Sequence, residues 1–133
     1  MSWHVRLEVG NYCNLRCPLC VREKVHKSTI NSIHLSLKDV QKFLPRFFLN
    51  YEVERVALSG AVAEPTLNPD FIEIVKYLMK YSTVAIDSNG STRDTQWWAE
   101  LGATGVNCDF APDSLKPNNN KYRINSNTDR VID

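Results

Sequence analysis

The sequence lacks both a long apolar run and an excess of charge of either sign. Its longest apolar stretches, such as FIEIVKYLM at residues 71–79, are broken by charged residues. They fall far below the roughly 18 residues that suggest a membrane span. Lysine and arginine number 16 against 15 aspartates and glutamates, so no broad charged surface is expected to attract nucleic acid or an anionic membrane. Any partner must therefore be inferred from a site.

A secretion signal is also missing, because MSWHVRLEVG alternates charged and apolar residues instead of placing basic residues ahead of an apolar segment. We therefore expect a cytoplasmic protein. Only four cysteines occur, and three of them lie in NYCNLRCPLC, residues 11–20. In a reducing compartment such clustered thiols more often bind metal or carry out redox chemistry than form disulfides. The length of 133 residues favours one compact domain, residues 1–133.

Apolar patterns predict strands that alternate with helices. Val5, Leu7 and Val9 alternate with charged residues before Gly10, which is typical of a strand. Further strands are predicted within residues 55–60, 83–90 and 103–110, and helices within residues 34–44, 68–79 and 94–102. This alternation is the pattern of βαβ units with a parallel sheet, so the predicted fold class is α/β.

Several residues indicate where the predicted helices begin and end. Ser36 with Asp39 three residues later predicts a capped helix that Pro45 ends. Asn68 is predicted as the cap of the second helix, with a proline at its first position, and Gly102 as the end of the third. The Asn-rich tail is predicted to begin as a loop and to start a fourth helix near Thr128.

Chemically active residues follow each predicted strand. In parallel α/β folds, functional groups gather at the carboxyl ends of the strands, so residues in these four loops are expected on one face. In chain order the candidates are Cys13, Cys17 and Cys20, then Glu64, Asn89 and Asp113.

The spacing Cys-x3-Cys-x2-Cys suits three thiolates that converge on one polynuclear centre. An iron–sulfur cube usually takes four cysteines, so three would leave one iron open to a substrate or cofactor. A tetrahedral zinc site completed by His26 or His34 is the main alternative, and buried structural thiols are another. Cys108 lies within a predicted strand and is interpreted as a core residue.

These segments resemble a known family. The loop NYCNLRCPLC resembles the signature of the radical S-adenosylmethionine (radical SAM) superfamily, and SGAVAEPTLNPDF, residues 59–71, is similar to its Gly-x-x-Gly-Glu-Pro-Thr segment. IDSNG resembles the end of its third strand, and FAPDSLKPNNNKYR resembles its fourth-strand segment in Asp113, Tyr122 and Arg123. The matching segments cover nearly the whole chain in the family's order.

The resemblance implies that Cys13, Cys17 and Cys20 hold a 4Fe-4S cluster whose free iron binds S-adenosylmethionine. Glu64 would accept a hydrogen bond from the amino group of S-adenosylmethionine, and Asn89 and Asp113 would lie near its ribose and methionyl portions. The cluster, reduced by an external electron donor, would cleave S-adenosylmethionine. The resulting 5′-deoxyadenosyl radical would abstract hydrogen from an unknown substrate.

The resemblance further implies a parallel (βα) partial barrel of about four strands and three helices, half of the family's barrel. A C-terminal remainder or an oligomer would then cover the open edge of the sheet. The sequence differs from the family pattern at Leu19, Ala61, Ala63 and Ala111. The alternative function is a non-catalytic zinc- or cluster-binding module that acts through a partner.

Overall fold

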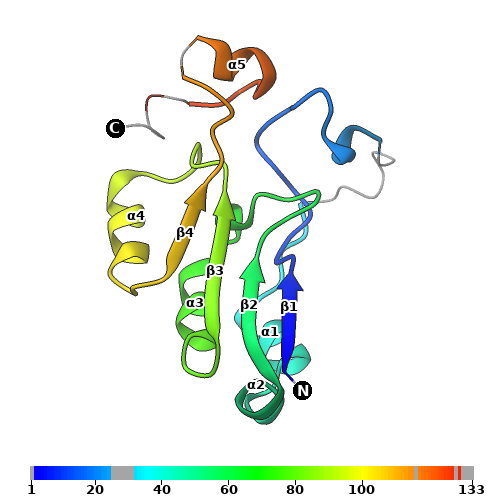
Figure 1. Cartoon of the computed structure of the whole chain (residues 1–133), viewed down its shortest axis with the longest axis vertical. Helices are drawn as coiled ribbons and strands as arrows, with labels where there is room; N and C mark the ends of the chain where they lie inside the picture. Colours follow the sequence, from blue (N-terminus) through cyan, green and yellow to red (C-terminus); the bar gives the residue numbers. More distant parts are fainter. Residues whose placement is uncertain (1, 25–31, 116, 128, 130–133) are drawn as a thin grey trace.

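The computed structural model describes residues 2–24, 32–115, 117–127 and 129. Within them, four strands form one sheet in the order β1-β2-β3-β4, and every neighbouring pair is parallel. The strands are β1 (Trp3–Leu7), β2 (Val53–Leu58), β3 (Thr83–Ser88) and β4 (Asn107–Phe110). They lie side by side in Figure 1 and confirm the predicted parallel α/β fold.

Helices connect the strands in chain order. The connection from β1 to β2 contains α1 (Leu37–Phe43) and α2 (Arg46–Glu52), whereas α3 (Phe71–Leu78) and α4 (Thr95–Gly102) make the next two crossovers. The chain continues after β4 with α5 (Asn118–Tyr122). Short 3-10 helices occur at η1 (Val21–Lys24) and η3 (Pro65–Leu67).

Two helices were not predicted. Pro45 ends the first predicted helix as expected, but it also caps α2, which begins at the next residue. The Asn-rich tail forms α5 where a loop was predicted, because the buried side chain of Asn119 organises it. The helix start predicted near Thr128 falls on residues that, apart from Asp129, lie outside the described part of the chain.

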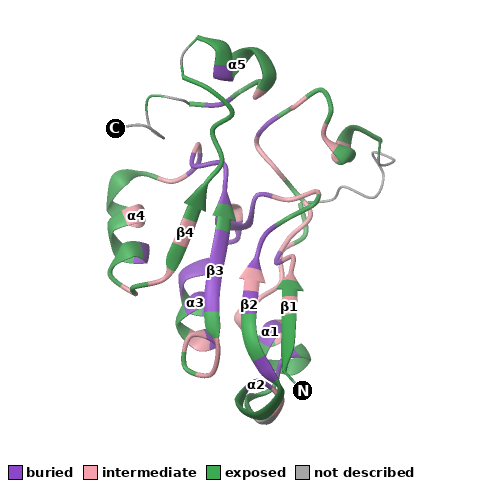
Figure 2. Ribbon diagram, viewed as in Figure 1, coloured by how far each residue is buried: buried purple, intermediate pink, exposed green. Residues whose placement is uncertain are grey.

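The core lies between the sheet and one layer of helices. The predicted face of α3 is buried, and it packs against the buried side chains of β2 and β3. Figure 1 shows α1 and α3 behind the sheet, and Figure 2 shows β3 as the most buried strand. A large apolar side chain contributes roughly 1.5–3 kcal/mol to the stability of the fold when it is fully buried. The main α3 residues are Phe71, Ile74, Val75 and Leu78.

The start of α1 was predicted correctly and the start of α3 was not. Ser36 and Asp39 form a reciprocal capping box at α1. The helix α3 begins only at Phe71, with Asp70 as its N-cap. The Oδ1 of Asn68 accepts from the Asp70 backbone N–H (2.8 Å) and closes a turn before the helix. The Nδ2 of Asn68 donates to the carbonyl oxygens of Val9 (2.7 Å) and Leu35 (2.8 Å). Asn68 therefore fastens the segment after β2 to the segment after β1.

The opposite face of the sheet has no helix packed on it among the described residues, and it carries charge. Arg6, Arg55 and Asp87 are exposed there, whereas apolar residues beside them in the strands are partly or fully buried. Within the described residues β4 pairs only with β3, so its outer edge is open. No helix in that part of the chain is long and apolar enough to cross a membrane.

Candidate functional site

The cysteine loop, residues 11–20, leaves β1 at the carboxyl edge of the sheet and is anchored by neighbouring segments. The backbone N–H of Glu64 donates to the carbonyl of Tyr12 (2.8 Å), and that of Arg16 donates to the carbonyl of Ile124 (3.0 Å). The loop is thereby joined to the segments that follow β2 and β4.

Arg22 braces the same loop from inside. Its Nη1 donates to the carbonyl oxygens of Cys13 and Leu15, both at 2.8 Å. Its guanidinium also lies 5.7 Å from the centre of the Tyr12 ring. Arg22 was not predicted as a site residue, and its place two residues after Cys20 was the only signal in the sequence.

The loop lines a cavity of about 260 Å³ at this edge. Residues from the ends of β2 and β3 line the same cavity, as expected when carboxyl ends of parallel strands meet. Five of the six predicted site residues are therefore together, namely Cys13, Cys17, Cys20, Glu64 and Asn89. All three cysteines are free thiols of intermediate exposure.

The sulfur of Cys13 receives hydrogen bonds from its surroundings. The backbone N–H of Leu15 lies 3.4 Å from it, and Nδ2 of Asn89 lies 3.8 Å from it. Burial raises the pKa of the Cys13 thiol, while the Leu15 N–H and the charge of Arg22 act in the opposite direction. A bound metal ion would displace the thiol proton and overcome this burial cost.

Glu64 connects the end of β2 to the end of β3. Glu64 is 5% exposed, and its carboxylate accepts four hydrogen bonds. Oε1 accepts from the Thr66 backbone N–H and hydroxyl and from the Ser88 hydroxyl, and Oε2 accepts from the Asn89 backbone N–H. Only Oε2, with one donor, retains clear capacity for the amino group of a cofactor. The predicted contact with S-adenosylmethionine stays a prediction.

Asn89 connects the end of β3 to the cysteine loop. Its Nδ2 donates to Oδ1 of Asn14 (3.0 Å) as well as approaching the Cys13 sulfur. Its Oδ1 accepts from the Ser91 backbone N–H (2.8 Å), which closes a tight turn. Gly90 supplies the left-handed backbone of that turn at φ 69°. Asn89 thus combines the turn chemistry expected of Asn-Gly with a position in the site.

Asp113 is the one predicted residue that does not line the cavity. Its carboxylate pairs with Arg123, whose Nε lies 2.6 Å from Oδ2 and whose Nη2 lies 3.2 Å from Oδ1. Arg123 does line the cavity. Asp113 therefore reaches the site through this ion pair, and a direct contact with a cofactor stays a prediction.

The positions that differ from the family pattern lie around the cavity. Ala61, Ala63 and Ala111 line it, whereas Leu19 is 80% exposed and does not. Gly60 cannot be replaced by a larger residue without a backbone shift, since a Cβ on it would lie 2.2 Å from the Ala63 carbonyl oxygen. A close approach of two backbone segments thus explains this glycine.

The zinc alternative finds no support in the described part of the chain. Those residues contain no group of three or more His, Cys, Asp or Glu side chains arranged to hold a single metal ion. His34 is described and is not part of such a group, whereas His26 lies outside the described residues. A polynuclear cluster spreads its thiolate ligands over a larger distance than one zinc ion does, so this finding bears only on a mononuclear site.

Two buried polar atoms indicate that the cavity suits a polar group. Nε of Arg22 and Oγ of Ser59 have no hydrogen-bond partner within the described ranges, and both residues line the cavity. Buried polar groups in folded proteins are rarely left without a partner. Together with three thiols on one loop, these atoms fit a cluster with inorganic sulfide and a charged cofactor.

Comparison with known protein families decides the assignment. The family model "Radical SAM superfamily" matches residues 7–133, which is nearly the whole chain. The chain belongs to the radical SAM superfamily. The resemblance recognised in the cysteine loop and in residues 59–71 is thereby confirmed. Radical SAM proteins use a 4Fe-4S cluster and S-adenosylmethionine, so the expected cofactors are those of the family.

Curated relatives of this radical SAM chain include the GTP 3′,8-cyclases. The protein from Haemophilus ducreyi is 31% identical over 119 residues, which cover 86% of this chain and 34% of the relative. The protein from Cronobacter sakazakii is 32% identical over 111 residues, which cover 79% of this chain and 33% of the relative. The chain spans about a third of the length of these proteins.

Solved structures show the same fold. The structure of native anSMEcpe with bound AdoMet has a TM-score of 0.69 at 21% identity and covers 91% of this chain and 36% of its own. The structure of BtrN in complex with AdoMet and 2-DOIA has a TM-score of 0.59 at 15% identity, covering 92% and 55%. At these identities the likeness concerns the fold, and it confirms the predicted partial barrel.

Proposed function

We propose that this chain binds a 4Fe-4S cluster and S-adenosylmethionine and forms the cofactor-binding part of a radical SAM enzyme. One observation carries the proposal. Three thiols from one loop share a single cavity with polar groups from the ends of two neighbouring strands. When bound, the cluster supplies the electron for reductive cleavage of S-adenosylmethionine, from which a radical for hydrogen abstraction arises.

Each part of the site has a proposed task. Cys13, Cys17 and Cys20 would hold the cluster and would leave one iron free of protein ligands. Asn89 donates a hydrogen bond to the Cys13 sulfur, which holds the ligand in place and stabilises negative charge on it. Glu64 fixes the ends of β2 and β3 relative to each other, so that the cavity wall keeps its shape when S-adenosylmethionine binds.

A purine nucleoside triphosphate is the first substrate class to test. Both relatives named above are GTP 3′,8-cyclases. Arg6 and Asp87 line both the cysteine cavity and a neighbouring hollow of the sheet face, which Arg55 and His4 also line. Adjacent arginines at the edge of the cofactor site would suit a polyphosphate.

The proposal also includes partners and a compartment. An external electron donor is needed, because the cluster must accept an electron before S-adenosylmethionine can be cleaved reductively. A further polypeptide segment or a second subunit would pair with the open edge of β4. A reducing compartment such as the cytoplasm would keep the three thiols available for iron.

Anaerobic reconstitution with iron and sulfide tests the proposal. We expect about four irons per chain and brown absorbance, because three thiolates suffice to hold a cube. After reduction with dithionite, the protein should release 5′-deoxyadenosine from S-adenosylmethionine. The product is measured by chromatography with and without reductant.

Cys108→Ala is the matched control for the cysteines, since this thiol lies on β4 outside the cavity and burial raises its pKa to about 12. The variant should bind iron as the unaltered chain does. Stoichiometric zinc with no iron uptake and no 5′-deoxyadenosine would instead favour a non-catalytic module.

A further inference from the structure

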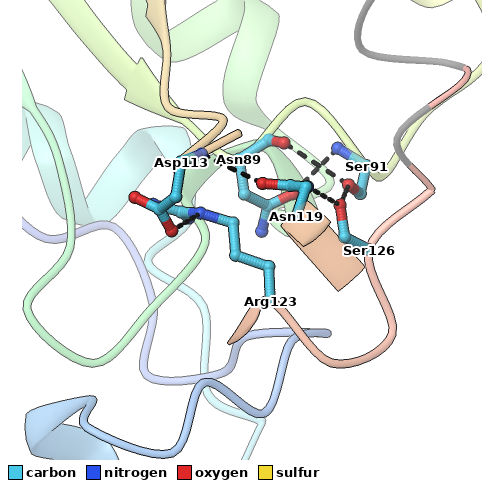
Figure 3. Close-up of polar contacts among 6 residues, drawn as sticks. All are labelled: Asn89, Ser91, Asp113, Asn119, Arg123 and Ser126. Carbon is cyan, nitrogen blue, oxygen red and sulfur yellow. Dashed lines mark hydrogen bonds and ion pairs between the residues drawn. The ribbon is translucent and has the colours of Figure 1, made fainter. Parts of the chain in front are cut away.

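The segment after β4 folds back over the cysteine loop around one buried amide. Asn119 is 1% exposed, and its Oδ1 accepts from the Asp113 backbone N–H (2.9 Å). Its Nδ2 donates to Oγ of Ser126 (3.2 Å). Figure 3 shows Asn119 between these partners. A single side chain thus joins the beginning and the end of residues 113–127.

This segment is attached to the site at two points. The Ile124 carbonyl accepts from the Arg16 backbone N–H on the cysteine loop (3.0 Å). The Ser126 hydroxyl lies 2.9 Å from the Ser91 hydroxyl after β3, and Figure 3 shows this pair beside Asn89. The position of Arg123, between Ile124 and Asn119 in the chain, is consequently fixed relative to the cysteines.

Arg123 brings a positive charge to the cavity. Its side chain is 19% exposed, and it lines the cavity with all three cysteines of the loop. Asp113 holds the guanidinium through two hydrogen bonds, but the Asp113 side chain is 45% exposed and its charge is therefore better screened by water. Arg123 thus presents the less screened charge of the pair.

Arg123 and the three cysteines line one cavity, so its charge would act on a cluster bound there. A cluster bound by three thiolates becomes more negative by one unit when it accepts an electron. A nearby cation that is partly removed from water stabilises that added charge.

We propose that Arg123 raises the reduction potential of the cluster and that Asp113 holds its guanidinium in position. The inference rests on the proposed function, because it requires the cluster at Cys13, Cys17 and Cys20. Arg123 is no ligand in this account, and it acts through its charge alone. One electron enters from the external donor, no bond is made or broken, and the added negative charge lies close to the guanidinium.

Potentiometric titration of the reconstituted full chain, followed by electron paramagnetic resonance, tests this role. Arg123→Gln should move the midpoint potential to a more negative value, and Arg123→Lys should restore most of the difference because it keeps the charge. Lys121→Gln is the matched control, since it removes one positive charge from the exposed surface of α5, the helix that Arg123 caps. It should leave the potential unchanged.

Asp113→Asn provides an independent arm for the case in which Arg123→Gln fails to hold the cluster. It keeps one acceptor oxygen to hold the guanidinium but removes the opposing charge, so the potential should move to a less negative value. An Arg123→Gln variant that binds iron normally and keeps an unchanged potential would overturn the inference. If only Asp113→Asn binds iron, an unchanged potential in that variant would overturn it. Either result would leave the proposed function intact. Failure of the unaltered chain to bind iron would overturn both.

Discussion

Replacement of Cys13, Cys17 or Cys20 by alanine is expected to abolish the 4Fe-4S cluster. Each removal leaves two thiolates on the loop, and two cannot hold a cube that already lacks its fourth protein ligand. The described residues offer no substitute, because Cys108 lies outside the cavity. We expect iron to fall from about four per chain to near zero after anaerobic reconstitution, measured together with sulfide and visible absorbance.

The structure supplies controls for this experiment. Cys108→Ala should keep full iron content, and far-ultraviolet circular dichroism should show that the three loop variants remain folded, since no loop cysteine belongs to the buried core. Iron content that stays unchanged in the Cys17→Ala variant would show that another ligand set holds the metal.

The variant Glu64→Ala is expected to lose stability even without cofactor. Its carboxylate is buried and accepts four hydrogen bonds from Thr66, Ser88 and Asn89. Truncation leaves several buried donors without a partner, at about 3 kcal/mol in the free energy of unfolding. In thermal unfolding followed by circular dichroism, this loss corresponds to a fall of roughly 10 °C in Tm.

Two further variants separate this effect from a simple loss of charge. Glu64→Gln keeps one acceptor oxygen but places an amide donor against other donors, so an intermediate loss is expected. Glu23→Ala removes an exposed carboxylate from η1 and should change stability by less than about 0.5 kcal/mol. A Tm for Glu64→Ala equal to that of Glu23→Ala would contradict the bracing role.

Periodic apolar patterns sufficed to predict the sheet and the buried face of α3, because side chains three and four residues apart share one side of a helix. Patterns failed where tertiary contacts decide. Asn68 is a good cap by residue type, yet its side chain closes a turn at Asp70 and binds the Val9 and Leu35 carbonyls, and α3 starts only at Phe71. The five-residue α5 likewise depends on the burial of Asn119.

The site could be predicted where topology alone brings residues together. The cysteines, Glu64 and Asn89 share a cavity because each follows a strand at the same sheet edge. The arginines that complete the cavity could not be found in this way. Arg22 enters the cavity through its bonds to loop carbonyls, and Arg123 through a segment folded over the site. Such contacts depend on side-chain packing, which spacing in the sequence does not encode.

The most direct test of the central claim is whether S-adenosylmethionine reaches an open iron of the cluster. Electron paramagnetic resonance of the reduced, reconstituted chain should change in g-values when S-adenosylmethionine is added, because a new ligand alters one iron of the cube. S-adenosylhomocysteine serves as the comparison ligand. A spectrum that stays identical at saturating S-adenosylmethionine would contradict the account, as would a reconstituted chain that gives no cluster signal at all.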